Sequence, residues 1–398
     1  MNQTQQKTGE FIALMAFLMS LVALAIDAIL PAFLAIGDAF AIEDPNQVQL
    51  IIGVLFLGMA VGQLFYGPLS DSIGRKPATY IGLVLFIIGS LISAFAADFE
   101  TMLAGRFLQG FGVAGPRTIS IAFVRDQYSG RAMARIMSFV ITIFILMPAL
   151  APSFGAGMLI YADWQSIFYL FALLACVNLV WLYLRQPETL PKDRRIPFSF
   201  ANILRGALEV LKNRISVGYM IVGGLAFAAL VSYLNMAKQV YLDVYGIDEM
   251  FPLYFAILAL AVGASSLVNG KIVMKYGMRP LMQGALALMI AASGSFLTYL
   301  LMFDGHAPFV LFMGAMMVIF FFMGILFGNA NAMAMEPMGH IAGIASSIIG
   351  AGTTFISMSL GTVIGQFYDQ TLMPMIAGFT VLAMTAYVLM MWIEKGQK

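Results

Sequence analysis

Charged residues are scarce in this sequence. Lysine, arginine, aspartate and glutamate make up 10% of its 398 residues, against about 25% in a typical soluble protein. Hydrophobic residues account for 61%, and they form runs that reach the ~20 residues needed to cross a bilayer as a helix. The composition therefore excludes an ordinary soluble domain and predicts an integral membrane protein.

Cysteine and histidine are nearly absent: the sequence has one cysteine, Cys176, and two histidines. One cysteine excludes an internal disulfide, and so few ligands argue against a cysteine–histidine metal site. We interpret Cys176, which lies in an apolar run, as a small core residue. No Walker motif, zinc-ligand spacing or nucleophile triad occurs, so we expect neither an enzyme nor an ATP-driven pump, and no cofactor. The net charge of +1, without a block of basic residues, gives no sign of nucleic-acid binding.

Turns and charged residues divide the chain into twelve apolar segments, which predicts an all-α membrane protein with twelve spanning helices. The first segment shows no small-residue cleavage site, so we interpret it as a span and not as a signal peptide. The predicted spans are 11–36, 47–70, 78–97, 101–124, 131–158, 164–186, 215–240, 250–272, 279–302, 309–332, 342–367 and 373–393.

Basic residues gather on one side of this predicted topology. If the chain starts inside, 18 of the 21 lysines and arginines fall in cytoplasmic segments, whereas the opposite loops carry mainly acids. The positive-inside rule then places both termini in the cytoplasm. The longest polar stretch, from Arg185 to Phe198, follows span six. We therefore expect an N-terminal bundle at 1–190, a linker with a short interfacial helix at 191–213, and a C-terminal bundle at 214–398.

The two halves share a short repeat. "GPLSDSIGRKP" (Gly67–Pro77) and "GKIVMKYGMRP" (Gly270–Pro280) lie 203 positions apart, and both join the second and third spans of their half. Two glycines, a basic residue and the proline coincide, which favours duplication. Asp71 corresponds to Met274, so only the first copy has the acid. Two parallel six-helix halves are the arrangement of major facilitator transporters.

Several motifs resemble that superfamily. "GQLFYGPLSDSIGRKP" is similar to its signature loop between spans two and three, "RFLQGFGVAG" (Arg106–Gly115) to the span-four motif of drug:proton antiporters, and "PALAPSFGAG" (Pro148–Gly157) to the span-five motif of exporters. "AIDAILPAF", "MARIMSF", "PETLP" and "NAMAMEPMGHIAGIASSIIG" resemble the bicyclomycin-resistance (Bcr/CflA) branch. The resemblance covers essentially the whole chain.

The resemblance implies a monomeric transporter of a bacterial inner membrane that exports small hydrophobic or amphipathic drug-like compounds in exchange for protons. The proton gradient would supply the energy, and the lipid bilayer, protons and a small molecule would be the partners. Two alternatives stay open: a proton-coupled importer of a small metabolite, and a membrane scaffold or sensor that transports nothing.

Three charged residues, Asp27, Arg106 and Arg117, lie five or more residues from the nearest end of a predicted span. An ionised carboxylate deep in a bilayer costs several kcal/mol, so Asp27 in span one is a candidate proton carrier, unless water at a helix end reaches it. The resemblance implies that Arg106 in span four is its partner in proton coupling; the alternative is an arginine that snorkels to the interface. Arg117 lies eleven residues further, roughly on the same face. Arg117 either lines the cavity and attracts anionic substrates or pairs with a neighbouring helix.

The loop between spans two and three is the candidate cytoplasmic gate. Asp71 falls at the C-terminal end of a helix, where the dipole disfavours an anion, so it needs a cationic partner or the N-terminus of another helix. Arg75, Arg131 and Arg135 are the candidate cations. The resemblance further suggests that Asp71 docks near Gly343–Ser346 at the start of span eleven. The residues assigned to this gate are Gly67, Asp71, Gly74, Arg75, Lys76, Arg131 and Arg135.

Two further groups complete the expected site residues. Pro148, Pro152, Gly155 and Gly157 form the span-five motif, whose prolines and glycines permit a bend and close helix contact. In the second half, polar residues within spans are few, and Asn235 and Asn331 are assigned to the substrate cavity together with Arg117.

Overall fold

The computed structural model describes residues 8–128 and 130–395, and within these ranges the chain is helical and forms no strand. Contacts group the chain into two compact units, residues 1–36 with 54–205 and residues 37–53 with 206–398. The segment 37–53 precedes the predicted boundary at 190, yet it packs with the second unit. Hydrogen bonds hold it there, since the side chain of Asn46 donates to the carbonyl of Tyr368 at 3.0 Å and that of Gln366 donates to the carbonyl of Asn46 at 2.8 Å.

The first unit holds most of the helices that precede the linker. Its helices are α1 (Thr8–Asp27), η1 (Leu30–Ala32), the first part of α2 (Phe33–Ala39), most of α3 (Leu50–Ile73), α4 (Arg75–Ala94), α5 (Phe99–Gln127), α6 (Gly130–Leu159), α7 (Gln165–Arg185), η3 (Lys192–Arg194) and the start of α8 (Phe200–Lys212).

The second unit holds the remaining helices and a short preceding segment. It contains the end of α2, η2 (Pro45–Gln49), the start of α3, most of α8, α9 (Arg214–Gln239), the π-helix η4 (Val240–Val244), α10 (Phe251–Tyr276), α11 (Met278–Met302), α12 (Phe309–Met335), η5 (Glu336–Ile341), α13 (Ala342–Gln366) and α14 (Met373–Glu394).

Each of the twelve predicted spans coincides with a helix, or, for the first, with a broken helix. Within the described residues, ten helices are long and apolar enough to cross a membrane. α5 is not among the ten, because arginines, glycines and polar residues replace much of its aliphatic surface; at about 1.5 Å per residue its 29 residues still exceed the bilayer core. In α6, the segment Leu146–Leu159 is apolar. The chain is a multi-pass membrane protein.

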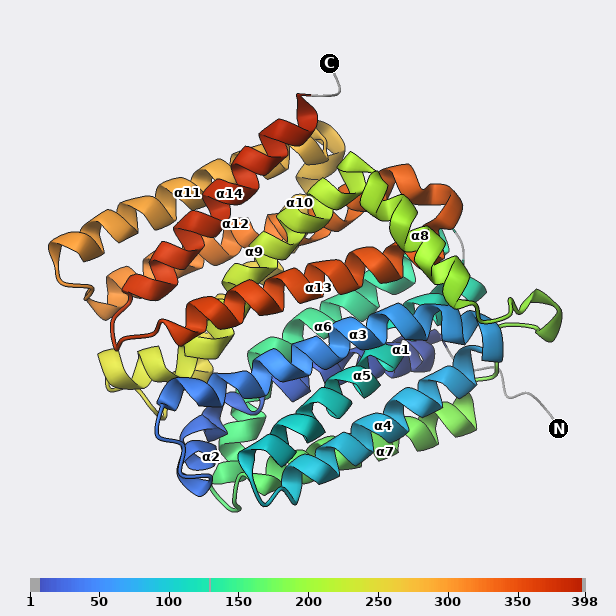
Figure 1. Ribbon diagram of the computed structural model, residues 1–398, viewed down its shortest axis with the longest axis horizontal. Coiled ribbons are helices and arrows are strands. Elements are labelled where there is room, and N and C mark those ends of the chain that lie inside the picture. The colour runs from blue at the N-terminus through green and yellow to red at the C-terminus, as the bar shows by residue number, and fades with distance from the viewer. Residues whose placement is uncertain (1–7, 129, 396–398) are drawn as a thin grey trace. The chain divides into compact units, whose positions relative to one another are not determined.

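Glycines bring backbones together in the first unit. α4 packs lengthwise on α5 and also on α7, as Figure 1 shows. A Cβ on Gly82 would lie 2.7 Å from the carbonyl oxygen of Gly112, and a Cβ on Gly105 would lie 2.9 Å from that of Gly89. Without side chains at these positions the two helices approach closely, as small residues allow in membrane proteins. This contact fixes α5, which carries both intramembrane arginines.

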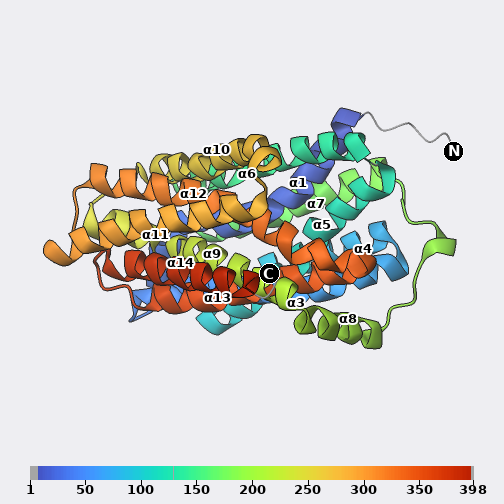
Figure 2. The same ribbon diagram turned by 90° about the horizontal axis from the view of Figure 1, so that it is seen from above.

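In the second unit, α9 packs against α13 and α14, while α10 and α11 pack on α12 (Figure 2). Amide side chains link its helices. Asn329 of α12 and Asn269 of α10 donate to each other's side-chain oxygens, at 2.8 and 3.3 Å. Gln49 donates to the side chain of Gln239 at 2.7 Å. These bonds satisfy polar groups within the unit without adding charge.

Cys176 is exposed and not in the core, so the prediction for this residue is wrong. It lies on α7 beside the exposed side chains of Leu173, Val177 and Val180. An apolar run in a membrane protein need not be buried by protein, because lipid covers the outward face of a spanning helix as well as a core would.

Candidate functional site

The first predicted span is interrupted at its one deep acid. α1 ends at Asp27, and the chain continues through a turn into η1 and α2. Pro31 explains the position of the break, because a proline lacks the N–H donor and its ring clashes with the carbonyl four residues earlier, here that of Asp27. The side chain of Asp27 is 4% exposed. Among the described residues, its carboxyl group has neither a hydrogen-bond partner nor an ion-pair partner.

Arg106 of α5 caps the broken end of α1. Its guanidinium is fully buried and donates to the carbonyl oxygen of Ala25 at 2.8 Å. The last carbonyls of a helix lack intrahelical donors, and a cation is favourable at this negative end of the helix dipole. The structure therefore places Arg106 on a carbonyl at a helix end, and its full burial is not that of an arginine that snorkels to the interface. Ala25 is two residues from Asp27, so both charged groups belong to one helix end.

Gln109 and Ser90 hold this guanidinium, and the sequence reasoning assigned neither residue. Gln109 accepts a hydrogen bond from Arg106 at 2.5 Å and donates to the hydroxyl of Ser90 at 2.8 Å. Ser90 in turn donates to the carbonyl of Phe86 at 2.7 Å, and all of these polar side chains are fully buried. The chain of bonds runs from α4 to α5 and fixes the direction of the arginine fork. Gln109 lies inside the span-four motif Arg106–Gly115, and this position was the sequence signal that could have identified it.

The span-five motif meets the same break. A Cβ on Gly155 of α6 would clash with the carbonyl of Ala28, the residue after Asp27. Pro148 and Pro152 lie inside α6, whereas a Cβ on Gly157 would meet open space. Of the four residues of this motif, Gly155 is the one for which close backbone approach at the break requires glycine.

Arg117 stands apart from this cluster. It lies eleven residues beyond Arg106, three turns and about 20° further round α5, so both arginines occupy one face. Its side chain is partly exposed, and its contact of hydrogen-bond type is with the sulfur of Met59 on α3 at 3.6 Å. Among the described residues no carboxylate pairs with it.

A second charged cluster lies where α3 ends and α4 begins. Gly74 joins the two helices with a φ of +109°, a conformation that favours glycine. The Arg75 guanidinium is almost fully buried and contacts Asp71 at 2.5 Å, Asp126 of α5 at 2.9 Å and the hydroxyl of Ser70 at 2.8 Å. Asp71 thus has the cationic partner that its place at a helix end requires. The hydroxyl of Ser70 donates to the carbonyl of Gly67 at 2.8 Å.

The linker closes this cluster. Glu188 of "PETLP" accepts hydrogen bonds from the backbone N–H groups of Arg75 and Lys76, both at 3.0 Å, and so caps the start of α4. Lys76 extends to the carbonyl of Tyr183 at 3.0 Å. The "PETLP" motif is visible in the sequence, but the capping role of Glu188 is not, because 112 residues separate Glu188 from Lys76. The side chains of Arg131 and Arg135, also assigned to the gate, lie outside the described residues.

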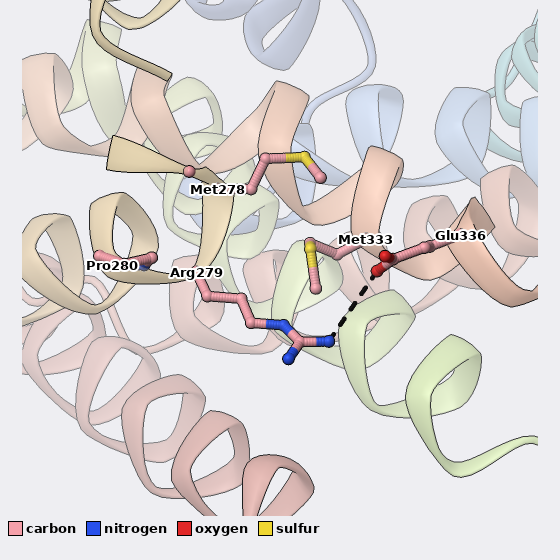
Figure 3. A pocket seen from close by; sticks show the side chains of 6 residues that line it. Met278, Arg279, Pro280, Met333 and Glu336 are labelled. Atoms are coloured by element: carbon pink, nitrogen blue, oxygen red, sulfur yellow. Dashed lines mark ion pairs between the residues drawn. The ribbon is translucent and has the colours of Figure 1, made fainter. Parts of the chain in front are cut away.

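The second unit has a weaker counterpart of this cluster. Gly277 also has a positive φ, +78°, and is followed by Met278 and Arg279 at the start of α11. Arg279 faces Glu336, at the end of α12, across a shallow pocket at 3.9 Å, as Figure 3 shows. Both of these side chains are exposed, and Met274, at the position of Asp71, is 90% exposed. The full set of charges therefore occurs in one half of the chain.

The two asparagines assigned to the second half differ in surroundings. Asn235 of α9 is fully buried and donates to the carbonyl of Gly361 on α13 at 3.3 Å, and its side-chain oxygen has no partner within the described residues. Asn331, near the end of α12, is exposed. The structure does not bring these two residues together.

The sequence and the fold have relatives. The family described as Major Facilitator Superfamily matches residues 14–362. The chain belongs to the major facilitator superfamily. It is 30% identical over 381 residues to a bicyclomycin resistance protein homolog of Haemophilus influenzae, with 94% of each chain covered. It is 30% identical over 307 residues to the multidrug resistance protein MdtL of Salmonella paratyphi A, covering 76% of this chain and 75% of that protein.

Solved structures share the fold. The xylose transporter XylE from E. coli, in a partially occluded inward open conformation, matches this major facilitator chain with a TM-score of 0.75 at 14% identity, over 97% of both chains. The human organic anion transporter MFSD10 matches with a TM-score of 0.67 at 16% identity, over 97% of this chain and all of that chain. Membership of this superfamily makes the protein a transporter and not an enzyme.

Proposed function

We propose that this major facilitator protein exports small hydrophobic or amphipathic drug-like compounds in exchange for protons across a bacterial inner membrane, with both termini in the cytoplasm. The names of its relatives, a bicyclomycin resistance homolog and a multidrug resistance protein, support the substrate class. The distribution of basic residues supports the orientation. The observation that carries the coupling is the buried carboxyl group of Asp27 at the break in α1, which has no partner among the described residues.

Asp27 and Arg106 serve as the coupling pair. A charge at this depth needs compensation, and Arg106 stands at the same helix end. The guanidinium rests on the carbonyl of Ala25 and on Gln109, and we assign this arrangement to neutral Asp27. When Asp27 loses its proton, the carboxylate attracts the guanidinium of Arg106. The N–H groups of this guanidinium then divide between the carboxylate and their present acceptors. A proton therefore changes which contacts hold α1 and α5 together, and this is what an exchange cycle needs.

The Arg75 cluster serves as the gate of the first half. Its arginine joins the end of α3 to the end of α5, and Glu188 ties the linker to the start of α4. Any movement between these helices must break charged contacts that are mostly buried. Of the charged residues that the sequence assigned to the gate, Asp71, Arg75 and Lys76 are those whose partners the structure describes.

The test is transport in inverted vesicles with an imposed pH gradient. We expect Asp27→Asn, which keeps the size and removes the titration, to lose proton-driven transport while exchange of labelled drug without a gradient continues. Asp38→Asn is the matched control, because Asp38 is an exposed acid in α2 eleven residues further on.

Full proton-driven transport by Asp27→Asn would overturn the coupling. Right-side-out vesicles distinguish export from import. Uptake driven by an inward proton gradient in these vesicles would mean that the protein imports a metabolite and does not export drugs.

A further inference from the structure

Arg117 differs from the other arginines whose partners the structure describes. Arg106 donates to a carbonyl and an amide oxygen, Arg75 pairs with two aspartates, and Arg185 pairs with Glu10 at 2.5 Å. Each of these guanidinium groups has oxygen acceptors. Arg117 has the thioether sulfur of Met59 at 3.6 Å, and a thioether is a weak acceptor.

Among the described residues Arg117 has no oxygen acceptor, and its depth in the membrane makes this energetically unfavourable. It lies 18 residues after the start of α5 and ten before its end, which is about 27 Å and 15 Å along the axis. Its surroundings include the buried apolar residues Met59, Val113 and Pro116. Arginine stays charged at any accessible pH, and charged side chains at such depth face the interior or a watered pathway and mark substrate routes.

An anion is the kind of partner that would satisfy the guanidinium of Arg117. A guanidinium presents a planar fork of donors that matches the two oxygens of a carboxylate, sulfonate or phosphate. In the described part of the first unit, the other deep charged groups are Asp27 and Arg106, which lie together at the opposite end of the same face, about 16 Å from Arg117. Arg117 is partly exposed, so a group from outside the chain can reach it.

We propose that Arg117 binds an oxyanion carried by the transported compound, so that the substrates of this protein include amphipathic organic acids. This inference rests on the transport function proposed above. The Met59 side chain beside the guanidinium fits the hydrophobic part of such a compound, and the fork fits its acid group. Arg117 is then a specificity residue, separate from the coupling pair.

The test compares matched probes. Binding of 1-naphthoate, 1-naphthalenesulfonate and 1-naphthyl phosphate to the purified full chain is measured against neutral 1-naphthamide by isothermal titration. We expect at least one of the anions to bind about tenfold more tightly than the amide, the size of a charge-assisted hydrogen bond. Arg117→Gln removes this preference, and Arg117→Lys keeps part of it. Arg125→Gln, an exposed arginine on the same helix, keeps all of it.

Two results overturn the proposal. In the first, no anion binds better than the amide, or Arg117→Gln keeps the preference. In the second, the anions do not bind, and phosphatidylglycerol in nanodiscs raises the unfolding temperature of the wild type but not of Arg117→Gln, which assigns the oxyanion to a lipid headgroup. The binding assay needs no proton gradient, so Asp27→Asn with full proton-driven transport would refute the coupling and leave the anion preference standing.

Discussion

The two units of this transporter solve the same problem, polar groups inside a membrane, with different chemistry. The first unit carries charges: Asp27, Arg106 and Arg117 at depth, and the Arg75 cluster at a helix junction. In the second unit the reciprocal Asn269–Asn329 amide pair links α10 and α12, and the buried charge described, Lys238, lies near the end of α9 and pairs with Asp248. Charged contacts respond to protons and to bound ions, whereas amide contacts do not titrate. We therefore expect protons and bound ions to act mainly on contacts of the first unit.

The helix junctions repeat this difference. Both contain a glycine at positive φ followed by a basic residue. In the first unit Arg75 is 3% exposed and bonded to two carboxylates, whereas in the second Arg279 and Glu336 are exposed and 3.9 Å apart. The two junctions thus share the backbone turn, whereas the charge network around it is complete in one of them.

The largest expected effect compares these two arginines. Arg75→Met leaves Asp71 and Asp126 without their cation, and we expect a loss of about 3 kcal/mol in the free energy of unfolding, at the low end for a broken buried pair because both carboxylates keep some contact with water. Arg279→Met should change it by less than about 0.5 kcal/mol, as for an exposed pair. Unfolding in mixed micelles with a denaturing detergent measures both, and equal losses would mean that the two junctions do not differ in this way.

An intermediate effect compares two buried amides. Gln109→Leu deprives the Arg106 fork of an acceptor, and Asn329→Leu leaves Asn269 unpaired; we expect each to cost about 1.5 kcal/mol in stability. Only Gln109→Leu should also shift the pH profile of transport, because only Gln109 touches a charged group of the coupling pair.

Two serines of α4 provide the control for that pH profile. Ser90→Ala should shift the profile in the same direction as Gln109→Leu, because Ser90 anchors Gln109. Ser93→Ala should not, since the fully buried Ser93 bonds instead to the carbonyl of Met102 at 3.3 Å. A shift of the same size in Ser93→Ala would show that loosened packing, and not the position of Arg106, changes the profile.

The smallest effect compares two helix starts. Asp98 caps α5 by accepting the backbone N–H of Thr101 at 2.7 Å, and this bond lowers the pKa of Asp98 below its ordinary value. Its stabilisation is therefore complete above about pH 4 and is lost as the pH falls through the lowered pKa of the folded state. Asn213 caps α9 with a neutral amide that accepts from Ile215 and Ser216.

We expect Asp98→Asn to remove the loss of stability at low pH that comes from this cap. We expect Asn213→Asp to add a similar loss of stability at low pH. The free energy of unfolding measured between about pH 5 and pH 2 records both changes. If Asp98→Asn leaves the slope with pH unchanged, the capping bond does not distinguish folded from unfolded protein.

Much of the fold could be predicted from the sequence, because the bilayer demands long apolar helices and charges mark their ends. Each of the twelve predicted spans has its helix, and the placement of Asp27, Arg106 and Arg117 within them was readable from apolar neighbours. The break in α1 was missed, because 11–36 was taken as one span although Pro31 cannot continue a helix over Asp27. Cys176 was misread, because hydropathy does not distinguish a side chain facing lipid from one facing protein.

The sequence by itself determined which residues are charged, how deep they lie and which half carries them. Only the tertiary structure decided their distant partners: Arg106 on the carbonyl of Ala25, Arg75 on Asp126, and Glu188 on the start of α4. The physical reason is that periodicity and spacing describe one helix at a time. A hydrogen bond between residues 51 to 113 positions apart depends on how helices pack, and here glycines that let α4 and α5 touch set that packing.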